Sequence, residues 1–198
     1  MTHSGYEVAH DLIEEFCAPL DCFRCKHPRY AHFVGGALIF RAAAELEPVR
    51  VLLLQRAEDD SYGNKWEFPG GKCEESDRTY LDGICRETWE ETGLNISKFV
   101  GLVASREWQK DDGSYVVKFT FVVEVRELGS NVQPDNGIAP GLSEPSIKLD
   151  PKEHQAFVWA TEEEVKASSD DGPGVFKSFK EQRAVILEGF KVQRGFIV

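Results

Sequence analysis

The sequence predicts one mixed α/β domain, a sandwich in which helices flank a sheet. Runs rich in β-branched and aromatic residues alternate with segments whose apolar residues recur at helical spacing. One helical pattern lies in mid-chain and another near the C-terminus, so that helices can cover both faces of the strands. A chain of 198 residues can bury one full core. We therefore expect a single domain over residues 1–198, with an N-terminal helix and cysteine-bearing turn in residues 1–30 and a long Gly- and Pro-containing loop at 128–151.

The first third of the chain is expected to supply one helix and two strands. Residues 6–20 place apolar side chains close to helical spacing before Pro19, which predicts a short amphipathic helix. Residues 32–40 and 49–55 are β-rich runs separated by a charged connection, a pattern typical of paired strands. Pro and Gly residues in the segment 62–72 predict a loop, and a helix follows it.

The second half of the chain is expected to add three strands and two helices. Residues 99–106 and 115–127 are strand candidates joined across an Asp-Asp-Gly turn, which predicts a hairpin. Residues 155–160 predict a last strand. The Thr-Glu-Glu-Glu sequence that begins at Thr161 is a capping box, so we expect a short helix there. The apolar spacing in residues 175–190 predicts a C-terminal helix.

The charge balance excludes some classes of partner. There are 34 Asp and Glu residues against 23 Lys and Arg, a formal net charge of −11, so a long nucleic acid is not an expected partner. No apolar run approaches the length of a membrane span, and the N-terminus lacks the pattern of an export signal. The five cysteines suit a reducing compartment. We therefore expect a cytoplasmic protein, without a membrane partner, and leave a homodimer open.

The helix after the glycine-containing loop carries the most informative pattern. Thr79 is its expected N-cap and Gly93 its expected left-handed C-terminal residue, so the helix should span residues 80–92. Its buried face is expected to contain Leu81, Ile84, Cys85 and Thr88. Three acids, Glu87, Glu90 and Glu91, fall at spacings at which like charges destabilise a helix, and they lie near its negative dipole end.

Two interpretations of these acids are open. They could form a solvated acidic face, but no lysine follows at the compensating spacing. Alternatively, a cation supplies the missing positive charge, and clustered carboxylates suit Mg²⁺ together with substrate phosphates. Gly83 lies on the same arc as Glu87 and Glu90, which we interpret as room for an ion or a phosphate to approach.

These residues resemble a known motif. The stretch Trp66-Glu67-Phe68-Pro69-Gly70-Gly71, followed by Arg86-Glu87-Thr88-Trp89-Glu90-Glu91-Thr92-Gly93-Leu94, is similar to the Nudix box of the Nudix hydrolases. The resemblance implies a Nudix-type α/β/α sandwich with a mixed central sheet.

The sequence departs from the family pattern at three points. Fourteen residues separate Gly71 from Arg86, one more than the pattern allows. Counting back from Arg86 places Arg78 where an acid is expected, although Asp77 lies one position earlier. Thr88 replaces a bulky aliphatic residue. The first two departures concern the partner of Arg86, and none of the three alters the helix glutamates.

The resemblance also implies an activity and a cofactor. The expected reaction is metal-dependent hydrolysis of a diphosphate linked to another moiety, with a nucleoside diphosphate derivative as the leading substrate class and non-nucleotide diphosphates open. Mg²⁺ or Mn²⁺ would be held by Glu87, Glu90, Glu91 and a backbone carbonyl of Gly71, while Arg86 would orient the glutamates. The competing hypothesis is a Nudix-fold binding module without catalysis, motivated by Arg78 and the inserted residue.

Candidates for substrate contact come from the strands. Arg56, Arg106 and Lys118 lie in or next to predicted strands and could reach phosphates, or could form ordinary surface ion pairs. Trp108 and Tyr115 flank the hairpin tip, where an aromatic ring could stack on a base or serve packing.

Two further questions stay open. The general base is either a box glutamate or a distant acid, Glu144 or Glu153. A second group of residues could form a zinc site or remain reduced thiols, and consists of Cys17, Cys22, Cys25 and His27.

Overall fold

The computed structural model describes most of the chain. The described residues are 2–3, 5–41, 47–59, 62–126, 146–168 and 180–195. The loop predicted at 128–151 therefore lies largely outside the described residues, as does Glu144. Residues 146–150 carry no helix or strand.

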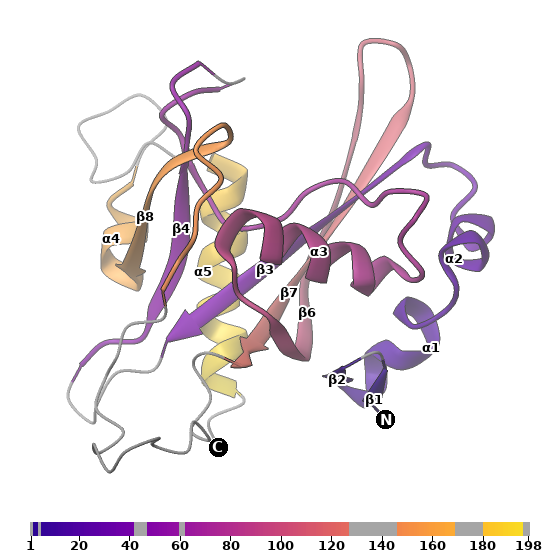
Figure 1. Cartoon of the computed structure of the whole chain (residues 1–198), viewed down its shortest axis with the longest axis horizontal. Coiled ribbons are helices and arrows are strands. Elements are labelled where there is room, and N and C mark those ends of the chain that lie inside the picture. The colour runs from indigo at the N-terminus through magenta and orange to yellow at the C-terminus, as the bar shows by residue number, and fades with distance from the viewer. Residues whose placement is uncertain are drawn as a thin grey trace.

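The strands form the mixed sheet that the resemblance implied (Figure 1). Their bounds are β1 Thr2–His3, β2 Tyr6–Val8, β3 His32–Arg41, β4 Arg50–Arg56, β5 Trp66–Glu67, β6 Ile96–Gln109, β7 Tyr115–Val125 and β8 His154–Thr161. The order is β1-β2-β6-β7-β3-β4-β5, with β8 paired to β4. The pairs β2–β6 and β3–β7 are parallel and the others antiparallel. The hairpin predicted between β6 and β7 is confirmed.

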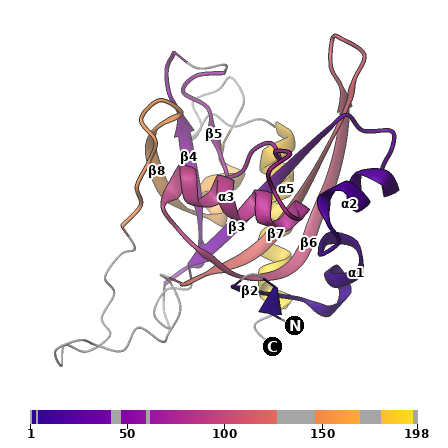
Figure 2. The same ribbon diagram turned by 45° about the vertical axis from the view of Figure 1, so that its right-hand side comes forward.

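The helices cover the sheet on both faces, as the sequence predicted (Figure 2). Their bounds are η1 His10–Leu12, α1 Ile13–Phe16, α2 Leu20–Lys26, α3 Tyr80–Thr92, α4 Glu162–Lys166 and α5 Lys180–Gly195. One buried cluster contains Tyr80 and Ile84 of α3, and the other contains Ile186 and Phe190 of α5. No helix in the described part of the chain is both long and apolar enough to cross a membrane.

The helix predicted over residues 6–20 is wrong in its first half. Tyr6 and Val8 are buried on alternate positions of β2, which pairs with β6 instead of continuing a helix. The Tyr6 hydroxyl also donates a hydrogen bond to Asp82 Oδ1 at 3.0 Å, which anchors this strand to α3. Helix α1 ends at Phe16, and Pro19, which was predicted to end the helix, is instead the N-cap of α2.

The predicted pairing of the first two long strands is only partly confirmed. β3 and β4 pair at one end, through Phe40–Val51 and Arg41–Arg50. Along most of its length β3 is instead parallel to β7, and β4 pairs with β8. Both strands thus lie between other strands, which explains their nearly continuous apolar runs.

Local capping signals placed two helices correctly. The Thr79 side chain accepts a hydrogen bond from the Asp82 amide, and Gly93 ends α3 with a φ of 72°. Thr161 and Glu164 form the reciprocal capping box of α4. The predicted C-terminal helix is described from Lys180 to Gly195, and residues 171–179 lie outside the described part.

Candidate active site

The glycine-containing loop lies directly against strand β3. The amides of Ala37 and Gly35 donate to the carbonyls of Pro69 at 2.9 Å and Gly71 at 2.8 Å. Gly70 has a φ of 144°, and a Cβ there would lie 2.2 Å from the Gly35 carbonyl oxygen. Only glycine fits this position, which holds the loop beside the C-terminal half of α3.

Glu91 is the buried acid of the site. Its side chain is 7% exposed, and its Oε2 accepts a hydrogen bond from the Gly70 amide at 2.7 Å. Burial raises the pKa of Glu91 to about 8, and the negative charges of Glu67, Glu87 and Glu153 act in the same direction, against the Gly70 hydrogen bond.

Glu87 lies against the same loop, whereas Glu90 is more exposed. A Cβ at position 71 would lie 2.3 Å from Glu87 Oε2, so glycine is needed for this close approach. Burial raises the pKa of Glu87 despite the opposing charge of Arg86. Glu90, with a side chain 48% exposed, bonds to Arg86.

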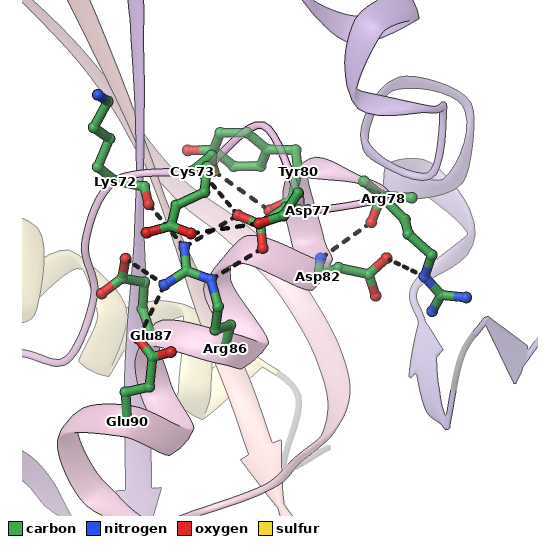
Figure 3. Close-up of polar contacts among 12 residues, drawn as sticks. Lys72, Cys73, Asp77, Arg78, Tyr80, Asp82, Arg86, Glu87 and Glu90 are labelled. Carbon is green, nitrogen blue, oxygen red and sulfur yellow. Dashed lines mark hydrogen bonds and ion pairs between the residues drawn. The ribbon is translucent and has the colours of Figure 1, made fainter.

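Arg86 joins the acids to the preceding loop (Figure 3). Its Nε and Nη2 donate to the two oxygens of Asp77 at 3.0 and 3.1 Å, and Nη2 also donates to the Lys72 carbonyl. Nη1 donates to Glu87 and Glu90, each at 2.9 Å. The acid that faces Arg86 is therefore Asp77.

Arg78 takes no part in this network. Its side chain is 72% exposed and lies 3.4 Å from Asp82, on the side of the loop away from Arg86 (Figure 3). The interpretation of Gly83 as room for an ion is corrected. A Cβ there would meet Asp77 Oδ2 at 2.8 Å and Cys73 Sγ at 2.9 Å, so the space beside Gly83 is filled by protein.

The turn before β8 adds residues that sequence reasoning missed or left open. Glu91, Glu153 and His154 each offer one ligand atom, and these atoms lie within 4.8 Å of one another. His154 Nε2 lies 3.3 Å from Glu67 Oε1, which also accepts from Arg56 at 2.6 Å. Glu67 belongs to the motif stretch, but nothing in the sequence indicated that His154 would reach it.

A cavity of about 560 Å³ opens beside this site. Its lining includes Glu67, Phe68 and Gly70 of the site. It also includes four of the five candidates for substrate contact, Arg56, Arg106, Lys118 and Trp108. Helix α5 contributes Glu181, Gln182 and Val185, which the sequence did not single out.

The cavity cations already have partners in the protein. Lys118 Nζ lies 4.4 Å from the Phe68 ring centre, and burial lowers the pKa of this lysine. The Arg106 guanidinium lies 5.8 Å from the Trp108 ring centre and 3.7 Å from Glu181. Tyr115 lies instead beneath Arg29, at 4.4 Å, and does not line the cavity.

The cysteine-containing group does not assemble a metal site. Within the described residues, the ligand atoms that converge are those of Glu91, Glu153 and His154. The His27 ring packs against the Phe23 ring in a tilted arrangement with ring centres 4.5 Å apart, and all five cysteines are free thiols. The structure therefore favours reduced thiols over a zinc site.

The site residues fit a divalent cation. Glu87, Glu91 and Glu153 supply carboxylate oxygens, and the charge of Glu153 acts to raise the pKa of both Glu87 and Glu91. The Gly71 carbonyl, already bonded to Gly35, retains a second lone pair. Hard oxygen donors in this number suit Mg²⁺ or Mn²⁺.

Comparison with solved structures identifies the fold. The chain superimposes on a MutT NUDIX hydrolase from Burkholderia pseudomallei with a TM-score of 0.52 and 19% identity, over 79% of this chain and 96% of that one. An Ap4A hydrolase from C. elegans gives a TM-score of 0.55 and 19% identity, over 84% and 100%. The NUDIX domain of Shewanella oneidensis NrtR, solved with ADP ribose, gives 0.54 and 15%, over 84% and 88%.

Sequence comparison identifies the family. A MutT-like protein from Streptomyces ambofaciens is 42% identical over 50 residues, which cover 25% of this chain and only 29% of that protein. The model of the NUDIX domain matches residues 33–180, well over half of the chain and the part that holds the loop, α3, the cavity strands and β8. The chain therefore belongs to the NUDIX domain family of hydrolases.

Proposed function

We propose that the protein is a metal-dependent pyrophosphohydrolase that cleaves a nucleoside diphosphate linked to another moiety. The observation that carries this proposal is that Glu87 and the buried Glu91 both lie against the glycine-containing loop, with Glu153 close to Glu91, beside a cavity lined by cations and aromatic rings. Carboxylates crowded in this way repel one another, and a bound cation would relieve that repulsion. The neighbouring cavity has the size of a small-molecule site.

The carboxylates would hold the metal, and the loop would hold the carboxylates. Glu87, Glu90, Glu91 and the Gly71 carbonyl are the proposed ligands, and Mg²⁺ or Mn²⁺ is the proposed ion. When bound, the ion would neutralise phosphate oxygens and lower the pKa of an attacking water. Arg86 orients Glu87 and Glu90 through its hydrogen bonds, while Asp77 fixes the guanidinium.

The general base is proposed to be Glu153 or a box glutamate. Glu153 lies in the turn before β8, whose backbone is fixed because the Ala57 amide donates to the Glu153 carbonyl at 2.8 Å. Its carboxylate is within 4.8 Å of the Glu91 ligand atom, so it can reach a water at the same metal face.

The cavity would bind the part of the substrate beyond the cleaved bond. Arg56, Arg106 and Lys118 supply positive charge for phosphates. Trp108, at 37% exposure, offers a ring face on which a planar base could stack. One structural neighbour is named as an Ap4A hydrolase and another was solved with ADP ribose, and both compounds are nucleotides of this general kind.

A turnover screen tests the proposal. The full-length protein would be assayed with Mg²⁺ and with Mn²⁺ on nucleotide sugars, dinucleoside polyphosphates, nucleoside triphosphates and non-nucleotide diphosphates. We expect hydrolysis of at least one nucleotide class, and loss of turnover by orders of magnitude in Glu90→Gln. Glu75→Gln, an exposed acid outside the helix, is the matched control and should retain full activity.

The alternative is a binding module without catalysis, which was suggested because Arg86 seemed to lack an acidic partner. Asp77 supplies that partner, so this reason for the alternative no longer holds. Metal binding without turnover on any substrate of the screen would nevertheless favour it. The proposed partner is a small diphosphate and not a long nucleic acid. The five free thiols fit a reducing compartment, which we propose to be the cytoplasm, and a homodimer stays a prediction.

A further inference from the structure

The outer half of the β6–β7 hairpin carries two of the proposed substrate contacts, and it projects from the body of the molecule (Figure 1 and Figure 2). Arg106 and Trp108 line the cavity from β6, where residues 105–109 are all exposed. Within the described residues, the outer edge of β6 pairs with β2 only at Lys98 and Phe99, so strand pairing holds the outer part of β6 through β7 alone. An exposed strand with so few neighbours is a part of a sheet that opens readily.

The opposite face of the same strand is held by residues that precede the matched NUDIX domain. Successive side chains of a strand point to opposite faces, so Glu107 faces away from the cavity that Arg106 and Trp108 line. Arg29 Nη1 donates to both carboxylate oxygens of Glu107, at 3.1 and 3.2 Å. The Tyr30 hydroxyl donates to Glu107 Oε2 at 2.5 Å. Three hydrogen bonds therefore converge on one carboxylate at the back of the substrate contacts.

The turn that supplies these donors is itself fixed to the sheet. The Tyr30 amide donates to the His27 carbonyl at 3.1 Å, and the Ala31 amide donates to the Tyr115 carbonyl at 2.9 Å. The Arg29 guanidinium also lies 4.4 Å from the centre of the Tyr115 ring, at the start of β7. The turn thus contacts both strands of the hairpin on the face away from the cavity.

On the cavity face the hairpin has a weaker tether. Arg106 Nη2 lies 3.7 Å from Glu181 Oε1 of α5, and both side chains are about half exposed. A substrate phosphate that binds Arg106 would compete with this carboxylate, because the guanidinium pairs with either anion. The contacts of Glu107 involve no cavity residue, so they can hold the strand while substrate is bound.

We propose that Arg29 and Tyr30 brace the hairpin through Glu107 and thereby hold Arg106 and Trp108 in position for the substrate. This inference rests on the proposed function, which makes those two side chains substrate contacts. Glu107 is a positioning residue and does not line the cavity. Loss of the brace would weaken binding of the substrate and of the transition state alike, so it would raise KM and leave kcat nearly unchanged.

Hydrogen exchange measured by mass spectrometry tests the brace without substrate. In Glu107→Ala, which removes all three hydrogen bonds, peptides covering residues 105–115 should exchange about three- to tenfold faster than in the wild-type protein. Peptides from α3 should be unchanged, which checks that the variant is folded. Glu124→Ala is the matched control. It removes an exposed ion pair with Lys98, 3.9 Å away on the same two strands, and should leave exchange of the hairpin unchanged.

Steady-state kinetics with the nucleotide that turns over fastest in the screen tests the consequence for substrate binding. KM should rise about three- to tenfold in Glu107→Ala, and in the same direction in Arg29→Ala, while kcat changes by less than about twofold. The double variant should match Glu107→Ala, because both substitutions remove the same contact. Glu124→Ala should keep the wild-type KM.

The outcomes separate the brace from the proposed function. Unchanged exchange of the hairpin in Glu107→Ala, an unchanged KM, or KM effects that add in the double variant would each overturn the brace and leave the hydrolase intact. A screen without turnover would contradict the hydrolase, and ADP binding followed by tryptophan emission would then test the brace. Weaker ADP binding in Glu107→Ala than in Glu124→Ala would support it, and equal binding in the two variants would overturn it.

Discussion

Replacing Glu91 by Gln should stabilise the metal-free protein at alkaline pH. The side chain is buried, and the hydrogen bond that it accepts from the Gly70 amide can be kept by the Gln oxygen. The substitution preserves the shape of the side chain but removes a charge whose burial raises the pKa to about 8. The free energy of unfolding would thus rise, while metal binding would weaken, a trade-off that is common at functional sites.

The sign and size follow from the pKa values. An unfolded Glu has its ordinary pKa of 4.5, whereas folded Glu91 has one of about 8. Between these values the native state keeps a proton that the unfolded state has lost, so stability falls as the pH rises through this window. At about 1.4 kcal/mol per pH unit, the free energy of unfolding falls by about 5 kcal/mol in total above pH 8, and by almost nothing below pH 4.5. The Glu91→Gln variant does not undergo this decrease.

Urea unfolding at pH 5 and pH 9 with EDTA present measures the effect. The free energy of unfolding of Glu91→Gln should exceed that of the wild-type protein by about 1 kcal/mol at pH 5 and by about 5 kcal/mol at pH 9. Glu90→Gln is the control, since Glu90 is half exposed and should change stability by about 1 kcal/mol or less. An equal advantage at both pH values, or the same gain in Glu90→Gln, would refute the reasoning. With Mn²⁺ present the wild-type protein should become the more stable of the two, because its Glu91 carboxylate can bind the ion and the Gln side chain cannot.

Three further substitutions test separate parts of the structure. Arg86→Ala should lower kcat by about 10- to 100-fold through loss of glutamate orientation, and steady-state kinetics should show no such loss for the exposed Arg78→Ala. Trp108→Ala should raise KM by the equivalent of about 1–3 kcal/mol of stacking, and an unchanged KM would exclude ring contact with substrate. Tyr80→Phe should lower the free energy of unfolding in urea by about 1–3 kcal/mol, because the Phe119 amide loses its buried acceptor. A loss below about 0.5 kcal/mol would contradict that role.

The sequence predicted those elements whose signals are local. Helix α3 begins after the Thr79 cap and ends at Gly93, both of which act within one helical turn. The β6–β7 hairpin likewise depends on a short turn. In contrast, Tyr6 and Val8 fit a helix by spacing, and only their contact with β6 and Asp82 makes them a strand. Such pairing involves residues far apart in the chain, which periodicity does not detect.

In the candidate site too, residues that are close in sequence could be predicted, whereas residues that are far apart in sequence could not. The acids of α3 share one motif, so their proximity could be predicted from helical spacing. His154 and Gln182 reach Glu67 across 87 and 115 positions of sequence. The fold brings them together, since β8 pairs with β4 and α5 lines the same cavity as Glu67. From the sequence alone, nothing distinguished His154 or Gln182 from the other polar residues, because the order of the strands was not known.

The inserted residue shows why motif spacing and site geometry need not coincide. An extra residue inside α3 would rotate all that follows by about 100° and carry the glutamates away from the loop. Arg78 instead lies before the Thr79 cap, where the backbone is not yet helical, and its side chain is exposed. The helix therefore keeps Arg86 and the glutamates in one register, while Asp77 remains within reach of the guanidinium. An insertion that appeared to remove the partner of Arg86 has left the charge network intact, because it falls where the chain can absorb it.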